Sequence, residues 1–188
     1  MPPSIRRAVA TLGLALLATA AVVAQQRNPL PWAQRPSPHE SHSFTVDESK
    51  ITIEYGRPFK RGRVVWGGLR PWGQWWMPGA DEATTMITAD TLVIGDLTVP
   101  AGEHTLYMMV MEKDPKLIVS NETGQFHTVY HPARDLGRVT FQLRMLADPV
   151  EQMTWTFEQV PGGGGMLKLA WDDREYFVPF VVKKQARP

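Results

Sequence analysis

The sequence predicts an all-β protein that folds as a single antiparallel β-sandwich or jelly-roll-like domain of about ten short strands. Three observations support this fold class. Apolar and polar residues alternate along most of the chain, turn-forming residues recur at short intervals, and no segment after residue 24 shows a convincing 3.6-residue period. The length of 188 residues is consistent with one domain.

The first 24 residues have the form of a secretory signal peptide. Arg6 and Arg7 precede an apolar run from residue 8 to residue 24, and small residues occupy the positions that a signal peptidase reads. We therefore expect an exported protein, periplasmic or extracellular after cleavage, with no membrane span in the mature chain. The alternative is a single membrane anchor, for which this alanine-rich run is short and weakly apolar.

Composition limits the possible partners and chemistry. The chain has no cysteine, which excludes disulfides, thiolate nucleophiles and thiolate metal ligands. Loss of Arg6 and Arg7 with the signal peptide would lower the basic count from 20 to 18 against 19 acidic residues, a net charge near −1. Such a charge gives no general attraction to nucleic acid or to an anionic membrane, so any attraction has to be local. The oligomeric state is left open.

Residues 25–37 are polar and rich in proline, which predicts a flexible leader. We place the β-sandwich domain at residues 38–183 and a short tail at residues 184–188. The sequence contains no internal repeat of fixed period.

The strands are expected where apolar residues recur at every second position. In residues 50–55, Ile51, Ile53 and Tyr55 share one face, which is typical of a half-buried strand. In residues 138–146, the apolar side chains at odd positions from 139 to 145 are expected to face the same side. The full set of expected strands is 43–46, 50–55, 83–88, 91–99 (as a hairpin), 103–111, 116–120, 138–146, 152–160, 166–171 and 175–183.

Turn residues separate these runs. Gly95 and Asp96 lie between two apolar runs and predict a two-residue hairpin. Asp172 and Asp173 are expected to form a turn between two strands. Around residues 131–139 the sequence allows at most one helical turn.

The long connection between the expected strands at 50–55 and 83–88 is the main candidate for a binding site. It concentrates four of the seven tryptophans together with several arginines, and both residue types combine a large contact area with a polar end. We expect a cleft that takes a glycan, a peptide or a small anionic ligand. The residues expected to line it are Arg57, Arg61, Arg63, Trp66, Trp72, Trp75, Trp76, Asp81, Glu82 and Thr84. The alternative is that the tryptophans plug an open end of the sandwich.

Several ordered motifs resemble a known family. The segments ITIEYGRP, KRGR, WGGLRPWGQWW, GADEATT and VPAGEHTLYM are similar to the bacterial exported family known as domain of unknown function 2911. The resemblance extends from about Ser37 to Phe180 and implies an exported β-rich domain with no assigned activity. The chain departs from the family pattern at Met77, where the family usually has arginine, and at Asp81, where it usually has asparagine.

The sequence supports catalysis less well than it supports a binding cleft. The sequence has no Gly-x-Ser-x-Gly motif, so nucleophilic catalysis by serine has little support. A hydrolase that uses Asp81 or Glu82 as acid or base is the main alternative to a binding module. Such an enzyme could be assisted by a metal at His127 and His131, which are four residues apart. We expect no cofactor and no dedicated metal site, and a structural envelope or partner-docking domain is a third alternative.

Overall fold

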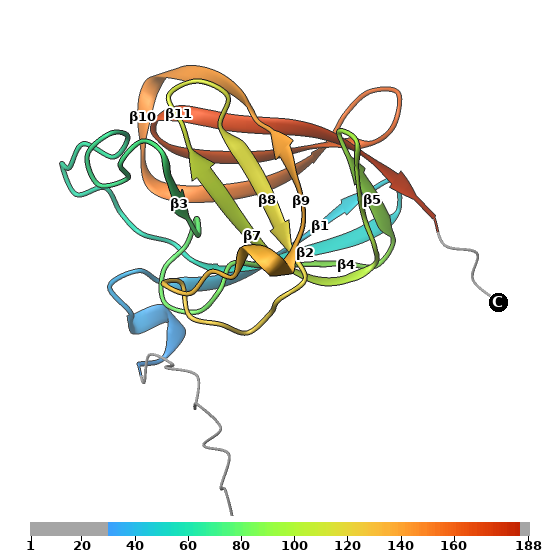
Figure 1. Cartoon of the computed structure of the whole chain (residues 1–188), viewed down its shortest axis with the longest axis horizontal. Coiled ribbons are helices and arrows are strands. Elements are labelled where there is room, and N and C mark those ends of the chain that lie inside the picture. Colours follow the sequence, from blue (N-terminus) through green and yellow to red (C-terminus); the bar gives the residue numbers. More distant parts are fainter. Residues whose placement is uncertain (1–29, 185–188) are drawn as a thin grey trace, which may run out of the picture.

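The computed structural model describes residues 30–184, which form two antiparallel sheets packed face to face (Figure 1). The expectation of an all-β sandwich is confirmed. The expected signal peptide at residues 1–24, the first part of the leader and most of the tail lie outside the described residues. Among the described residues, no helix is long and apolar enough to cross a membrane.

The larger sheet has seven strands in the order β1-β2-β4-β7-β8-β9, with β3 paired to β7, and the smaller has four in the order β10-β11-β5-β6. The larger sheet contains β1 (His39–Val46), β2 (Ser49–Gly56), β3 (Gln74–Trp76), β4 (Thr85–Thr88), β7 (Gly102–Val110), β8 (Lys116–Ser120) and β9 (Asp135–Thr140). The smaller contains β5 (Thr91–Ile94), β6 (Leu97–Val99), β10 (Gln142–Gln159) and β11 (Gly165–Lys183). Two 3₁₀ turns, η1 (Trp32–Gln34) and η2 (Pro132–Arg134), complete the described elements.

Local turn chemistry accounts for the shortest hairpin. The strands β5 and β6 pair from Ile94 opposite Leu97, which leaves Gly95 and Asp96 as the two-residue loop. Gly95 has a φ of 60°, a left-handed conformation that glycine adopts without steric cost. The predicted hairpin is therefore present.

The predicted strand at 138–146 is wrong as a single element, because the chain changes sheets at Phe141. The strand β9 pairs with β8 in the larger sheet, whereas β10 pairs with β11 in the smaller one. Beyond Phe141 the apolar positions no longer face the core, and Leu143 and Met145 are 37 % and 56 % exposed. A change of sheet is invisible to a period-two pattern that continues across it.

The predicted turn at Asp172-Asp173 is also wrong. These residues lie inside β11, where the pairing with β10 shifts register between Ala170 and Asp172. The extra residues lie on β10, because Val150 and Thr154 face Asp172 and Ala170. Asp172 has a φ of 54°, so β11 is irregular there and then continues. The Asp172 carboxylate contacts the connection between β2 and β3, where it pairs with Lys60 and accepts the Val65 N–H at 3.4 Å.

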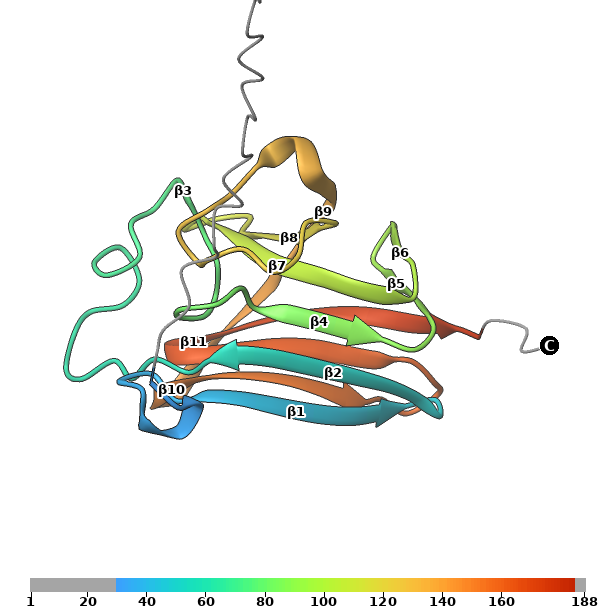
Figure 2. The ribbon, with the colours of Figure 1, turned by 90° about the horizontal axis from the view of Figure 1, so that it is seen from below.

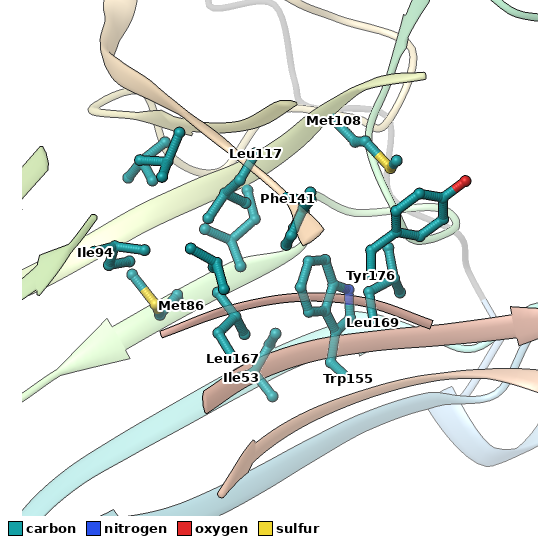
Figure 3. Packing of buried hydrophobic residues seen from close by; sticks show 14 of the residues in the cluster. Ile53, Met86, Ile94, Met108, Leu117, Phe141, Trp155, Leu167, Leu169 and Tyr176 are labelled. Carbon is teal, nitrogen blue, oxygen red and sulfur yellow. The ribbon is translucent and has the colours of Figure 1, made fainter. Parts of the chain in front are cut away.

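The core lies between the two sheets. Figure 3 shows Ile53 and Met86 of the larger sheet close to Leu167 and Trp155 of the smaller sheet, all of them buried. The largest fully buried side chains include Trp155, Trp171 and Tyr176, each contributed by the long β10–β11 hairpin. The chain has no cysteine and therefore no disulfides, so its stability depends on this buried apolar surface.

Candidate functional site

The segment between β2 and β3, residues 57–73, is called here the Trp/Arg loop. Figure 2 shows it extending sideways beyond the strands of both sheets. Its base is fixed to the smaller sheet, since the Lys60 N–H donates to the Glu151 carbonyl at 2.8 Å and the Lys60 ammonium pairs with Asp172. Within the loop, the N–H groups of Leu69 and Arg70 donate to the carbonyls of Val64 and Val65 at 2.9 and 2.7 Å. The loop is therefore an ordered element with its own hydrogen bonds.

Two of the predicted cleft tryptophans belong to the core. Trp66 and Trp76 are buried and pack edge to face with ring centroids 5.9 Å apart. Trp76 stacks on Trp171 at 5.7 Å, and the Trp66 indole N–H donates to the Trp171 carbonyl at 3.1 Å. The expectation that Trp66 and Trp76 form an exposed wall is wrong, because both indoles fill the open end of the sandwich.

The other two predicted tryptophans lie elsewhere. Adjacent residues on a strand point to opposite faces, so Trp75 faces away from Trp76 and packs against Tyr107 and Tyr130 on the outer side of the larger sheet. Trp72 is partly buried, with the Arg174 guanidinium 4.9 Å from its ring centroid. The four indoles therefore do not line one cleft.

The predicted arginines divide into two groups. Arg57 links strands of the two sheets, because its guanidinium donates to the Glu40 carboxylate at 2.8 Å and to the Thr154 hydroxyl at 2.8 Å. Arg61 and Arg63 are exposed, and their side chains donate only to backbone carbonyls of residues 36, 59 and 60. Within the described part of the chain, neither guanidinium forms an ion pair with a carboxylate, although the Arg61 backbone N–H donates to a Glu151 carboxylate oxygen at 2.8 Å.

Arg70 was not among the predicted site residues, although it lies in the same loop. Its guanidinium carbon is 4.5 Å from the ring centroid of Trp76, and its Nε atom and the Trp76 Nε1 atom are both buried without a hydrogen-bond acceptor among residues 30–184. Burial, and to a smaller extent the charge of Arg63, lowers the pKa of Arg70 to about 10. No described carboxylate lies within ion-pair distance of Arg70. Nothing in the sequence distinguishes this arginine from its neighbours.

The predicted acidic residues Asp81 and Glu82 are held by the last part of the leader. Arg35 is buried and binds Glu82 with both terminal nitrogens, the longer contact being 3.1 Å, while Asp81 is 3.8 Å away. Burial raises the pKa of Glu82, but the hydrogen bonds and charge of Arg35 outweigh it, so the net pKa lies below the usual value. This environment keeps Glu82 ionised and does not favour a role as general acid.

Thr84 does not lie at a rim, as the cleft hypothesis required. It is fully buried, and its hydroxyl donates to the Pro78 carbonyl at 2.8 Å. The same carbonyl accepts the Trp155 indole N–H at 3.0 Å, so the 77–84 segment is tied to the smaller sheet.

The two histidines considered for a metal site contact different groups. The His127 Nδ1 atom lies 2.9 Å from the Asp81 carbonyl, whereas the His131 Nδ1 atom lies 2.8 Å from a Glu122 carboxylate oxygen. Within residues 30–184, no group of three or more potential metal-ligating side chains is close enough to hold a metal ion.

The buried His39, which lies beside the Arg35–Glu82 ion pair, predicts a pH dependence of the free energy of unfolding. Burial lowers the pKa of His39 below its usual 6.5, and His39 Nδ1 is buried without a hydrogen bond, 3.6 Å from Glu82. The unfolded chain therefore binds a proton before the folded protein does, and stability is lost as the pH falls below 6.5 toward the lower folded pKa. We expect urea unfolding at pH values from about 7.5 to about 5.5 to show this loss, and His39→Gln to reduce its slope. Equal slopes for the parent and His39→Gln would contradict the assignment.

The fold and the loop define a β-sandwich protein that carries an ordered, cation-rich connection at one end of the sandwich. The chain belongs to the family described as "Protein of unknown function (DUF2911)", whose model matches residues 37–180. No curated protein and no solved structure matches the chain.

The structure shows the environment of Met77 and Asp81, the two positions where the sequence was expected to depart from the family pattern. Asp81 has a φ of 63°, a left-handed conformation that asparagine and aspartate tolerate better than other side-chain-bearing residues. Met77 is fully buried, and its sulfur accepts the Thr84 N–H at 3.0 Å. In this chain both positions therefore serve the packing of the 77–84 segment.

Proposed function

We propose that the protein is an exported binding module whose Trp/Arg loop takes a small anionic ligand through Arg70, with Arg63 beside it. Export is supported by the signal-peptide form of residues 1–24. The observation that carries the binding proposal is the Arg70 guanidinium, which is partly buried on the Trp76 ring and lacks a carboxylate partner among the described residues.

The chemistry of the stacked guanidinium supports an anion. A guanidinium that lies over an indole keeps its planar N–H donors available at the edge, where a carboxylate or phosphate can accept two parallel hydrogen bonds. Arg63 adds a second positive charge close enough to affect the pKa of Arg70. Two neighbouring cations without a counterion repel each other, and a bound anion would relieve that repulsion.

The packing of the indoles favours a small anionic ligand over a glycan or an apolar peptide. Flat recognition of a sugar ring needs an accessible indole face, whereas Trp66 and Trp76 are buried. Trp75 is 37 % exposed, but its ring packs against Tyr107 and Tyr130, away from Arg70 and Trp76. A groove of about 420 Å³ does lie over β1, β2 and β4. Its polar side chains already bond to one another, as in Ser41 with Glu54 at 3.1 Å and Ser43 with Thr52 at 2.9 Å.

The test is a titration of the protein with small anions, in which calorimetry and tryptophan fluorescence measure binding. We expect at least one of phosphate, citrate or glucuronate to bind, with neutral glucose as the inactive comparison. Arg70→Gln should weaken that binding about tenfold or more, because a hydrogen bond to a charged group is worth about 1.5–3 kcal/mol. Arg70→Lys, which keeps the charge but loses the planar fork, should give an intermediate affinity.

Arg134→Gln is the matched control, since it removes an exposed arginine from η2, a different part of the molecule. It should bind as the parent does. Binding of none of these anions, or equal affinities for the Arg70→Gln and Arg134→Gln variants, would contradict the proposal. Unfolding of each variant without ligand separates a weakened site from a weakened fold.

A further inference from the structure

The tip of the Trp/Arg loop, residues 61–64, combines charge with an exposed apolar side chain. Val64 is 71 % exposed, more than any other large hydrophobic residue among the described ones. Arg61 and Arg63 are exposed beside it, and the turn is made by Arg61 and Gly62 with φ values of 48° and 68°. The tip lies on the segment that extends beyond the two sheets in Figure 2. It therefore presents an exposed apolar side chain next to two exposed arginines.

Positive charge is not balanced by acidic residues within this part of the sequence. Residues 57–80 contain five basic residues and no acidic one, although the complete chain has a formal net charge of only +1. Two of the five, Arg57 and Lys60, pair with Glu40 and Asp172. The remaining three are Arg61, Arg63 and Arg70, and none of their guanidinium groups forms an ion pair with a described carboxylate. One carboxylate from outside the loop is close, since a Glu151 oxygen accepts the Arg61 backbone N–H at 2.8 Å. The local field at the loop is positive in an otherwise balanced protein.

We propose that the tip of the Trp/Arg loop docks on the surface of a bilayer that contains anionic phospholipid. Arg61 and Arg63 contact lipid phosphates, and Val64 enters the boundary between headgroups and acyl chains. This surface is separate from the Arg70 contact of the proposed function, although Arg63 takes part in both. Docking places the Arg70 site beside the membrane and does not require that a soluble anion bind there.

A lipid surface fits the tip better than a soluble polyanion does. Contacts with a soluble polyanion would be made by the arginines alone and would leave Val64 in water, whereas a bilayer offers phosphates and an apolar layer at adjacent depths. The cationic side chains can keep their charged ends among the headgroups while the Val64 side chain is buried, because arginine stems are long and flexible.

The experiment is co-sedimentation of the chain from Gln25 to Pro188 with lipid vesicles. Residues 1–24 are left out because their apolar run would itself bind lipid, and the chain used contains every described residue of the sandwich. The vesicles contain phosphatidylcholine alone or phosphatidylcholine with about 30 % phosphatidylglycerol. We expect binding to the anionic vesicles only, weakened by added salt.

Variants identify the contact. Arg61→Gln and Arg63→Gln should each lower the partition coefficient about fivefold, and Val64→Ser should lower it by a similar factor. The matched control is Val181→Ser, which removes an apolar side chain of the same size that is 50 % exposed on β11. Val181→Ser should bind vesicles as the parent does.

The proposal is overturned by equal binding to both kinds of vesicle, or by a Val64→Ser variant that binds as strongly as Val181→Ser. Loss on Arg61→Gln without loss on Val64→Ser would show a purely electrostatic contact without insertion of Val64 and would also overturn it. Failure of the proposed function is distinguishable, because it is measured by Arg70→Gln with small anions in the absence of lipid. Val64→Ser should leave that binding unchanged.

Discussion

Replacing Trp171 by alanine is expected to lower the free energy of unfolding by about 3–5 kcal/mol. The side chain is fully buried at the open end of the sandwich, where its ring stacks on Trp76 at 5.7 Å and meets Trp66 edge to face at 6.4 Å. Its indole N–H also donates to the Glu151 carbonyl at 3.3 Å. The cavity left by this side chain cannot close without moving two other indoles, so most of the loss remains after relaxation.

Urea unfolding and calorimetry measure this loss. A domain of this size typically has about 5–15 kcal/mol of stability, so the variant should unfold at a melting temperature lower by about 10 °C or more. The matched variant is Trp75→Ala, whose side chain is 37 % exposed on the outer side of the larger sheet, and its loss should be clearly smaller. Similar losses for the two variants would show that Trp171 is not part of a tightly packed plug.

The alternation of apolar and polar residues was enough to predict that the chain forms β-sheets, but it did not show which strands belong to which sheet. Period two shows which side chains share a face within a strand, and this pattern correctly placed Ile51, Ile53 and Tyr55 in the core. It cannot show that the chain leaves one sheet for the other at Phe141. It also missed β3, since three residues in a segment rich in glycine and proline are too few to display a period.

The candidate site was predicted as a segment but not as a set of contacts. The concentration of tryptophan and arginine led to the prediction of a cleft, but it could not distinguish Trp76, which is buried, from Trp75, which is on the opposite face. The partners that decide the role of each charge come from far away in the sequence. Glu82 is bound by Arg35, 47 positions earlier. Arg70 differs from Arg61 and Arg63 in lying over the Trp76 ring with its Nε atom buried.

The second large effect is expected from Gly56→Ala at the end of β2. A Cβ atom built on Gly56 would lie 2.4 Å from the Ala80 carbonyl oxygen and 3.0 Å from the carbonyl carbon. Backbone atoms cannot rotate away as a side chain can, so either β2 or the 77–84 segment has to move. We expect a loss of about 3 kcal/mol in the free energy of unfolding, near the upper end for overpacking.

The 77–84 segment is poorly able to yield, which is why the expected loss is large. The Pro78 carbonyl accepts hydrogen bonds from Thr84 and from Trp155, and Gly56 itself pairs with His39 across the β1–β2 ladder. A shift of either element would therefore disturb the ladder next to His39 or the hydrogen bonds of Pro78. Where the native backbone admits a Cβ atom, Gly→Ala instead stabilises a protein by about 0.4–1 kcal/mol, so the sign of the change is informative.

A second substitution identifies the contact that is responsible. The Ala80 Cβ atom would be 3.1 Å from the new Cβ atom, whereas the closer contacts are with the Ala80 backbone. Adding Ala80→Gly to Gly56→Ala removes only the side-chain contact, so the double variant should remain about as unstable as Gly56→Ala, with Ala80→Gly alone as the reference in a double-mutant cycle. Recovery of the parent stability in the double variant would show that the backbone contact is not the cause.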